Sequence, residues 1–121
     1  MQKRRILLVE DELTLRDTIE EILDFNDFDV KTASNGEVAL KILGTWKPDL
    51  ILSDVMMPVM SGFDLIEKVL AIDHLKDIPF VFLSALVAKN EQKKGTDLGA
   101  RAFITKPFKT ADLLKTIEKY L

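Results

Sequence analysis

Acidic, hydroxyl and amine side chains follow the short apolar runs of this sequence. Glu10 and Asp11 come directly after the first run, Ile-Leu-Leu-Val. Asp54 follows the run Leu-Ile-Leu after one serine, and Ser84 follows the run Phe-Val-Phe-Leu. Lys106 follows a fourth run after one threonine. If the ends of these runs meet in the fold, three carboxylates, one hydroxyl and one amine lie together.

Such a group has the composition of a site for a phosphoryl group and a metal ion. Clustered carboxylates repel one another, and a hard divalent cation relieves the repulsion. Mg²⁺ prefers one or two carboxylates and takes its remaining oxygens from water or phosphate. An amine and a hydroxyl can hold phosphoryl oxygens, and an Asp carboxylate can act as the nucleophile that forms an aspartyl-phosphate. The set therefore suits phosphoryl transfer, which depends mainly on positioning and charge neutralisation.

Alternating strands and helices must position these residues. Short apolar runs bounded by polar residues are typical of buried strands, whereas Leu13, Ile19 and Phe25 belong to a longer pattern with helical spacing. Ser34, Asn35 and Gly36 are candidate caps for the second helix, and Thr110 is a candidate for the last. Strands are expected at 6–9, 29–33, 50–52, 80–83 and 102–104, and helices at 13–25, 37–43, 63–72, 90–98 and 110–121.

Strict alternation of five strands and five helices predicts an α/β fold with a parallel sheet. We expect a single doubly wound (βα)5 domain over 1–121, a three-layer sandwich of the flavodoxin-like class with strand order 2-1-3-4-5. The weakly apolar strand 29–33 is expected at an edge, because central parallel strands are buried on both faces. Ligands of such folds bind at the carboxyl ends of the strands, where the order reverses.

Composition excludes several functions. The chain has no cysteine and a single histidine, His74, so disulfides, thiolate chemistry and sites that need two histidines are ruled out. A net charge of −3 argues against direct nucleic-acid binding, which usually requires a basic surplus. The longest apolar stretch is far shorter than the roughly 20 residues of a membrane span, and no signal peptide is recognisable. We therefore expect a cytoplasmic protein that does not bind membranes.

Four motifs, taken in order, resemble the receiver (CheY-like) domain of two-component response regulators. They are 7–12 (LLVEDE), 54–58 (DVMMP) with Gly62, 84–85 (SA) and 106–108 (KPF). The resemblance extends from about Arg5 to Tyr120, and the strand order given above is the one that this family adopts. Each motif alone is weak, but all four at the right strand ends form a strong signal.

The resemblance implies a role for each residue of the site. Asp54 corresponds to the phosphoacceptor, and Asp11 to a direct Mg²⁺ ligand. Glu10 would act through a metal-bound water, and Met56 would provide its backbone carbonyl to the metal. The remaining roles are phosphoryl binding by Ser84 and Lys106, switching by Ser84 with the aromatic Phe103, and loop shaping by Pro58, Gly62 and Pro107, the last with a cis bond before it.

Two positions that flank the phosphoryl group in this family are apolar here, namely Met56 and Leu86. Neither side chain can orient an attacking water by a strong hydrogen bond. We therefore predict slow self-dephosphorylation.

Other functions were weighed against a phosphorylation-controlled signalling domain. Haloacid-dehalogenase-like phosphatases also use an Asp nucleophile and Mg²⁺, but carry a second Asp two residues later, where this chain has Met56. A flavodoxin-like cofactor binder needs a phosphate loop after the first strand, and Glu10, Asp11 and Glu12 would repel phosphate there. No GxxxxGK[ST] nucleotide loop is present. A degenerate receiver used as a scaffold is disfavoured by the complete set of acids, hydroxyl and lysine.

The resemblance also implies partners. The phosphodonor would be a sensor histidine kinase or a histidine phosphotransfer protein. The recipient of the signal would be a downstream protein or an output domain outside this chain, reached through the face formed by the fourth helix, fifth strand and fifth helix. A phosphorylation-dependent homodimer is compatible with that face. The domain would not be an enzyme, because it assists only its own phosphorylation and dephosphorylation.

Overall fold

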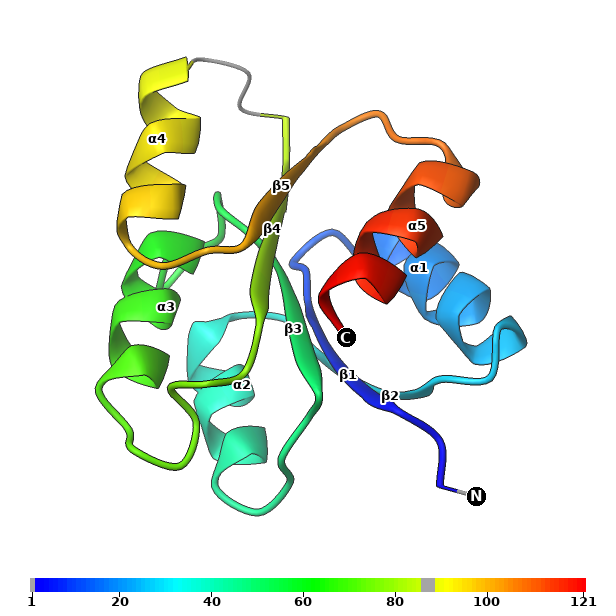
Figure 1. The fold of residues 1–121 in the computed structure, drawn as a ribbon, viewed down its shortest axis with the longest axis horizontal. Coiled ribbons are helices and arrows are strands. Elements are labelled where there is room, and N and C mark those ends of the chain that lie inside the picture. The colour runs from blue at the N-terminus through cyan, green and yellow to red at the C-terminus, as the bar shows by residue number, and fades with distance from the viewer. Residues whose placement is uncertain (1, 86–88) are drawn as a thin grey trace.

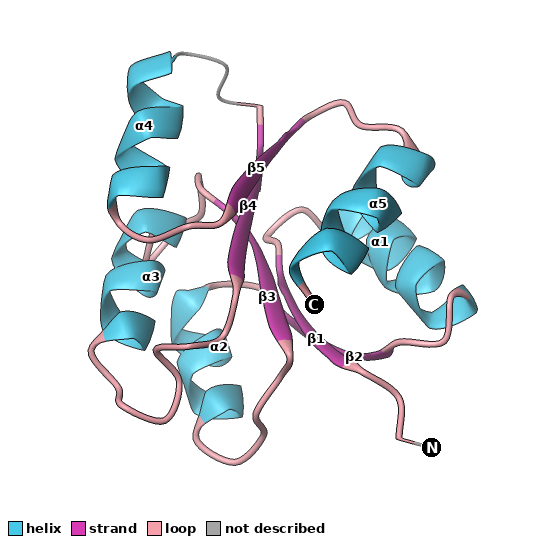
Figure 2. Cartoon of the chain, viewed as in Figure 1, coloured by secondary structure: helices cyan, strands magenta, loops and turns pink. Residues whose placement is uncertain are grey.

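A parallel sheet lies between two layers of helices in the computed structural model, which describes residues 2–85 and 89–121 (Figure 1). Strands and helices alternate along the chain without exception (Figure 2). The elements are β1 (Arg5–Val9), α1 (Leu13–Phe25), β2 (Asp29–Ala33), α2 (Gly36–Leu43), β3 (Leu50–Asp54), α3 (Gly62–Leu70), β4 (Phe80–Ser84), α4 (Lys89–Asp97), β5 (Ala102–Thr105) and α5 (Thr110–Tyr120).

The sheet has the strand order β2-β1-β3-β4-β5, with every pair parallel. This confirms the doubly wound fold. The order reverses at β1, which pairs with β2 on one side and β3 on the other, so the carboxyl ends of β1 and β3 are adjacent. β2 is at an edge, as predicted from its weak hydrophobicity. β5 is the other edge, and only Ile104 is buried in it.

Successive residues of the central strands contribute to two separate cores. In β1, Leu7 and Val9 belong to the cluster that includes apolar residues of α2 and α3. Ile6 and Leu8 belong to the cluster on the opposite face, with residues of α1 and α5. Side chains alternate between the faces of a strand, so a continuous apolar run is what a sheet covered on both faces requires. Figure 1 shows α1 and α5 on one side of the sheet and α2, α3 and α4 on the other.

Polar side chains begin most of the helices that the structure describes. The Asn35 side chain accepts a hydrogen bond from the backbone N–H of Val38, as a cap of α2 should. Glu12 caps α1 in the same way. The prediction of Thr110 as a cap was wrong, because Thr110 is already the first helical residue of α5. Lys109 occupies the cap position without a side-chain hydrogen bond.

Two apolar positions that helped to define the first helix are exposed. Leu13 and Phe25 are 59% and 87% exposed, whereas Ile19 and Leu23 in the middle of α1 are fully buried. Leu13 and Phe25 are the first and last residues of the helix, so the sheet beneath its centre covers neither of them. None of the helices in the described residues has the length and apolar character needed to cross a membrane.

Gly62 closes the loop that follows β3. Its backbone N–H donates to the carbonyl of Val55 at 2.8 Å. A Cβ atom at this position would lie 2.2 Å from the carbonyl oxygen of Asp54, which no real Cβ contact allows. The loop can therefore return to the end of β3 only because residue 62 has no side chain.

We predict that Gly62→Ala lowers the free energy of unfolding by about 1–3 kcal/mol, because the backbone must shift to admit the methyl group. Urea denaturation followed by circular dichroism measures this change. Gly44→Ala is the matched control, because Gly44 ends α2 with ordinary helical dihedral angles. Equal stability of the two variants would contradict the close approach at Gly62.

Candidate functional site

The acidic residues predicted from the sequence lie together at the carboxyl edge of the sheet. One carboxylate oxygen from each of Glu10, Asp11 and Asp54 lies within 4.8 Å of the others. Glu10 and Asp54 are buried and Asp11 is exposed. Glu10 and Asp11 follow β1, and Asp54 is the last residue of β3, so the pairing of these two strands brings the acids together.

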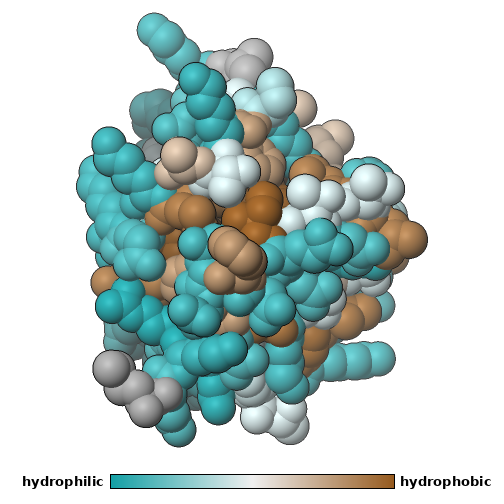
Figure 3. All heavy atoms as spheres, turned by 90° about the vertical axis from the view of Figure 1, so that its right-hand side faces the viewer, coloured by the Kyte–Doolittle hydropathy of each residue, from teal (hydrophilic) through white to brown (hydrophobic). Residues whose placement is uncertain are grey.

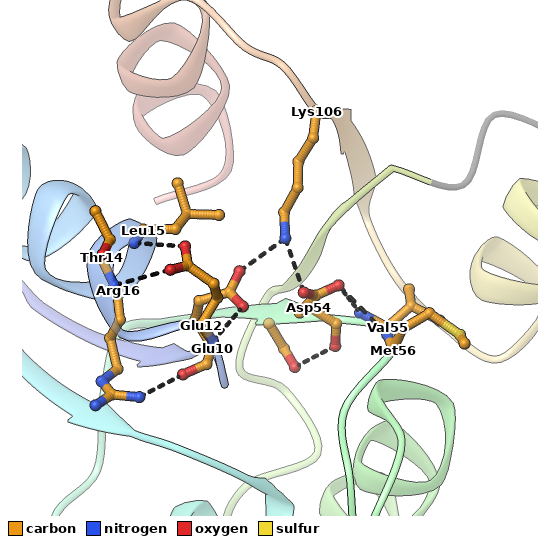
Figure 4. Close-up of polar contacts among 10 residues, drawn as sticks. Glu10, Glu12, Thr14, Leu15, Arg16, Asp54, Val55, Met56 and Lys106 are labelled. Carbon is orange, nitrogen blue, oxygen red and sulfur yellow. Dashed lines mark hydrogen bonds and ion pairs between the residues drawn. The ribbon is translucent and has the colours of Figure 1, made fainter.

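Lys106 joins the two buried acids. Its Nζ atom donates to Glu10 Oε1 and to Asp54 Oδ2, each at 2.8 Å (Figure 4). The backbone N–H of Lys106 donates to the carbonyl of Ser84 at 2.9 Å, which fixes the start of the β5–α5 loop beside β4. The Lys106–Pro107 peptide bond is cis, as the family resemblance implied. One amine thus neutralises charge on two acids from different strands.

Backbone amides orient the Asp54 carboxylate. Its Oδ1 atom accepts hydrogen bonds from the N–H groups of Val55 at 2.7 Å and Met56 at 3.3 Å. The other oxygen, Oδ2, faces Lys106 (Figure 4). The Met56 side chain is 66% exposed and points away from Asp54. The carboxylate is therefore held by main-chain donors on one side and by an ammonium group on the other.

A second set of contacts holds Glu10. Its Oε2 atom accepts a hydrogen bond from the Glu12 N–H at 3.1 Å. The Arg16 guanidinium donates to the Glu10 backbone carbonyl at 2.9 Å. Sequence reasoning missed Arg16, because an arginine in the first turn of an amphipathic helix looks like an ordinary surface residue. The one feature of the sequence that indicates this contact is the short separation of six residues between Arg16 and Glu10.

Burial and the lysine act in opposite directions on Glu10. The pKa of Glu10 is raised from its ordinary value of 4.5 to about 7, because burial raises it more than the hydrogen bond from Lys106 lowers it. Burial alone would lower the pKa of Lys106, but hydrogen bonds to Asp54 and Glu10 outweigh it, and the pKa is raised. Lys106 therefore stays protonated, while Glu10 takes up a proton more readily than a free glutamate.

The donor set fits a hard divalent cation. Mg²⁺ binds oxygen at about 2.0–2.1 Å, so ligands on opposite sides of the ion are about 4 Å apart. The three carboxylate oxygens lie within 4.8 Å of one another, close to this spacing. Exposed Asp11 adds a carboxylate on the solvent side of the two buried ones. Small side-chain movements or a bridging water would complete the coordination.

Ser84 lies next to the acids, as the sequence predicted. Asp54 pairs in register with Leu83, so Ser84 is the next residue along β4. Ser84 is 1% exposed and pairs with Thr105 of β5. Residue 84 therefore lies one position beyond the partner of Asp54 and beside the residue that precedes Lys106. Leu86, the second position predicted to influence hydrolysis, lies outside the described residues.

Phe103 belongs to β5, and its ring faces α4. Its ring is partly buried and lies 5.4 Å from the ring of Phe82, centroid to centroid. A Cβ atom on Gly95 of α4 would lie 2.9 Å from the Phe103 ring and 3.1 Å from that of Phe82. Gly95 is the one buried residue within Lys89–Asp97. The helix therefore approaches Phe103 closely through its glycine.

A hydrophobic hollow adjoins the site on the side of α1 and α5. It has a volume of about 520 Å³ and borders Lys106. Seen from this side, hydrophobic side chains gather at the centre of a mostly hydrophilic surface (Figure 3). The lining includes Leu15 and Ile22 of α1, with Pro107 and Phe108.

The raised pKa of Glu10 predicts a pH-dependent stability in the absence of metal. Between pH 4.5 and about 7 the folded chain holds a proton on Glu10 that the unfolded chain has lost. The stability that protonated Glu10 contributes to the folded state is fully present below pH 4.5 and is lost as the pH rises through about 7. We expect Glu10→Gln, which cannot ionise, to gain stability relative to wild type over this range, by on the order of 2 kcal/mol.

Urea denaturation of both proteins in EDTA at pH 5, 6, 7 and 8 measures this difference. Glu37→Gln, at an exposed acid in the first turn of α2, is the control for exchanging a carboxylate for an amide outside the site. A constant difference between Glu10→Gln and wild type at all four pH values would contradict the shift.

Comparison with known proteins agrees with this geometry. The family model of the response regulator receiver domain matches residues 6–118. A probable transcriptional regulator, ycf29 of Porphyra purpurea, is 35% identical over 96% of this chain and 56% of its own length. The response regulator MprA of Mycolicibacterium vanbaalenii is 32% identical over 97% of this chain and 50% of its own length. The chain thus spans about half the length of the curated relatives that it matches.

Solved structures show the same fold. The chemotaxis protein CheY4 of Vibrio cholerae superposes with a TM-score of 0.94 and 31% identity, covering 98% of this chain and 99% of the other. The receiver domain of the sensor histidine kinase PA1611 of Pseudomonas aeruginosa has a TM-score of 0.90 and 25% identity, covering 98% and 97%. That structure has a magnesium ion coordinated in its active site cleft. The chain described here belongs to the response regulator receiver domain family.

Proposed function

We propose that this receiver domain accepts a phosphoryl group on Asp54, with Mg²⁺ held by Asp11, Asp54 and the Met56 backbone carbonyl, and by Glu10 through water. The observation that supports this most directly is the contact of Lys106 with both Asp54 and Glu10 at 2.8 Å, beside exposed Asp11. An acid that is oriented by two amides and neutralised by an ammonium group is suited to act as a nucleophile.

The transfer step follows from the chemistry of the donor. An oxygen of Asp54 attacks the phosphorus of a phosphohistidine, the P–O bond forms and the P–N bond breaks. The leaving imidazole keeps the electron pair and takes a proton from solvent. Lys106 neutralises negative charge that the three incoming oxygens add. Bound Mg²⁺ would supply the remaining charge neutralisation at these oxygens.

Phosphorylation would then change the balance between two conformations. A phosphoryl group adds about −1.5 to −2 charges and three acceptor oxygens, so groups that can bind it favour the state in which they do. Ser84 and Lys106 adjoin Asp54 and are the residues proposed to bind it. Phe103 would transmit the change, since its ring faces α4. The altered surface would be the face formed by α4, β5 and α5.

The partners follow from the same role. The donor would be a sensor histidine kinase or a histidine phosphotransfer protein. The recipient would be a downstream protein or an output domain. Relatives of about twice this length are named as probable transcriptional regulators, which supports an output domain. DNA contact would then belong to that domain rather than to this acidic one. The domain would not turn over external substrates.

We expect acetyl phosphate to add one phosphoryl group to the purified protein in the presence of Mg²⁺, and none in EDTA. Asp54→Asn should abolish the adduct, because the amide is not a nucleophile. Asp29→Asn, at an exposed carboxylate where β2 begins, should react like wild type. Intact-mass spectrometry provides the measurement. An adduct on Asp54→Asn, or one formed equally well in EDTA, would contradict the proposed site.

We also expect the phosphorylated domain to lose its phosphoryl group slowly, with a half-life of minutes or longer. The Met56 side chain cannot position a water for attack. Met56→Asn, which introduces an amide next to the phosphoryl group, should hydrolyse faster. Both rates are measured by intact mass after removal of acetyl phosphate. A half-life of seconds in the wild-type protein would contradict the prediction.

A further inference from the structure

Arg16 contacts the main chain on both sides of Asp11. Its guanidinium donates to the backbone carbonyl of Glu10 at 2.9 Å (Figure 4). Its own backbone N–H donates to the carbonyl of Glu12, also at 2.9 Å. One residue in the first turn of α1 therefore holds the carbonyl groups of the residues that precede and follow Asp11.

The Asp11 side chain has no such support of its own. Asp11 is exposed, and its carboxylate makes no hydrogen bond or ion pair with the residues that the structure describes. The acids on either side of it are held, because Glu10 accepts from Lys106 at 2.8 Å and Glu12 accepts from two backbone N–H groups at the start of α1. The direction of the Asp11 carboxylate therefore depends on the main chain from which it extends.

The bond from Arg16 restrains that main chain. The N–H of Glu10 donates to the carbonyl of Ala33 at 3.0 Å, and the next peptide unit along the chain is the one that Arg16 holds. A peptide unit is planar, so the carbonyl of Glu10 and the N–H of Asp11 lie in one plane. Holding the carbonyl fixes the plane that leads into the Cα atom of Asp11, and this limits the directions that its side chain can take.

Arg16 provides this support without neutralising the acids of the site. Three acids, residues 10–12, precede it closely in the sequence. Among the described residues, however, the ion pairs do not include Arg16. A guanidinium that bonds a neutral carbonyl leaves the carboxylate oxygens available to a metal ion. The arrangement therefore orients Asp11 and keeps its carboxylate unpaired.

We propose that Arg16 is a positioning residue of the Mg²⁺ site, which holds the Glu10–Asp11 peptide so that the Asp11 carboxylate faces the ion beside Asp54. This inference rests on the metal site of the proposed function. Residues that hold a metal ligand without touching the metal typically change metal affinity by about 10- to 100-fold when they are removed. Arg16 acts on Asp11 through the main chain, so we expect the lower end of this range.

The charge of Arg16 gives the test a definite sign. Loss of a positive charge near the site would by itself strengthen Mg²⁺ binding, because like charges repel. Loss of the bond to the Glu10 carbonyl would weaken it, because Asp11 would no longer be oriented. A neutral variant that binds Mg²⁺ more weakly than wild type therefore reports the position of the ligand and not the change in charge.

The experiment titrates ¹⁵N-labelled protein with MgCl₂ and follows the amide signals of residues 10–12 and 54–56 by NMR, which needs no phosphodonor. Arg16→Met removes the charge and the donor, and should raise the Kd for Mg²⁺ roughly tenfold. Arg16→Lys keeps both on a slightly shorter side chain, so its Kd should lie closer to that of wild type. Arg4→Met is the control, because Arg4 forms an exposed ion pair with Glu118 before β1 begins, and it should bind Mg²⁺ like wild type.

Labelling by acetyl phosphate provides a second readout. If Arg16 acts through the metal, the ratio of the wild-type rate to the Arg16→Met rate should fall as the MgCl₂ concentration rises. A purely structural defect would lower the rate by the same factor at every MgCl₂ concentration. Thermal melting in EDTA shows whether each variant is folded. Arg16→Gln, whose amide falls short of the Glu10 carbonyl, serves as a second neutral variant and should lose the same affinity.

Several outcomes would overturn the role of Arg16. They are Mg²⁺ binding by the neutral variants as tight as that of wild type or tighter, an equal loss in Arg4→Met, a rate ratio that does not change with MgCl₂, and failure of both neutral variants to fold. A wild-type protein that binds no Mg²⁺, or that acetyl phosphate does not label, would instead refute the proposed function itself.

Discussion

The contact of one lysine with two buried acids organises the carboxyl edge of this domain. Glu10 and Asp54 could not both remain charged in a buried site without a nearby positive charge. Lys106 provides it at 2.8 Å from each, and it follows β5, the edge strand that β4 separates from β3. The contact therefore ties the ends of β1 and β3 to the loop after β5. An incoming phosphoryl group would compete with Glu10 and Asp54 for the same ammonium group. Lys106 would therefore serve both to hold the strand ends together and to bind the phosphoryl group.

The two-sided core explains why this contact forms reproducibly. Each central strand contributes side chains to both helical layers, so a shift in register would exchange the residues of the two cores. The strand ends are thereby fixed relative to one another. Glu10, Asp54 and Ser84 follow the last apolar residues of their strands, and the packing of those residues sets their positions.

Much of this arrangement could be predicted from the sequence, because the spacing of apolar residues and the length of apolar runs are local properties of the chain. The alternation of strands and helices and the edge position of β2 followed from them. The strand order was the one that the family resemblance implies, and the convergence of the three acids followed from that order. The contacts made by single side chains did not. The exposure of Phe25 depends on where the sheet ends, the left-handed backbone at Val59 depends on closure of the loop at Gly62, and the bond from Arg16 to Glu10 depends on tertiary geometry. The cap predicted at Thr110 failed because the helix starts one residue earlier than a capping hydroxyl requires.

The polar character of α4 has a consequence for how such a domain can diversify. Within Lys89–Asp97 the glycine is the one buried residue, so the side chains around it contribute little to folding. Substitutions on the outer surface of this helix would change charge and shape at small cost in stability, since exposed positions usually alter it by less than about 0.5 kcal/mol. New binding preferences could therefore arise on α4 while the acidic site at the ends of β1 and β3 stays intact. Because the outer surface of α4 is separate from the acidic site, the same fold could acquire different binding partners without a change in that site.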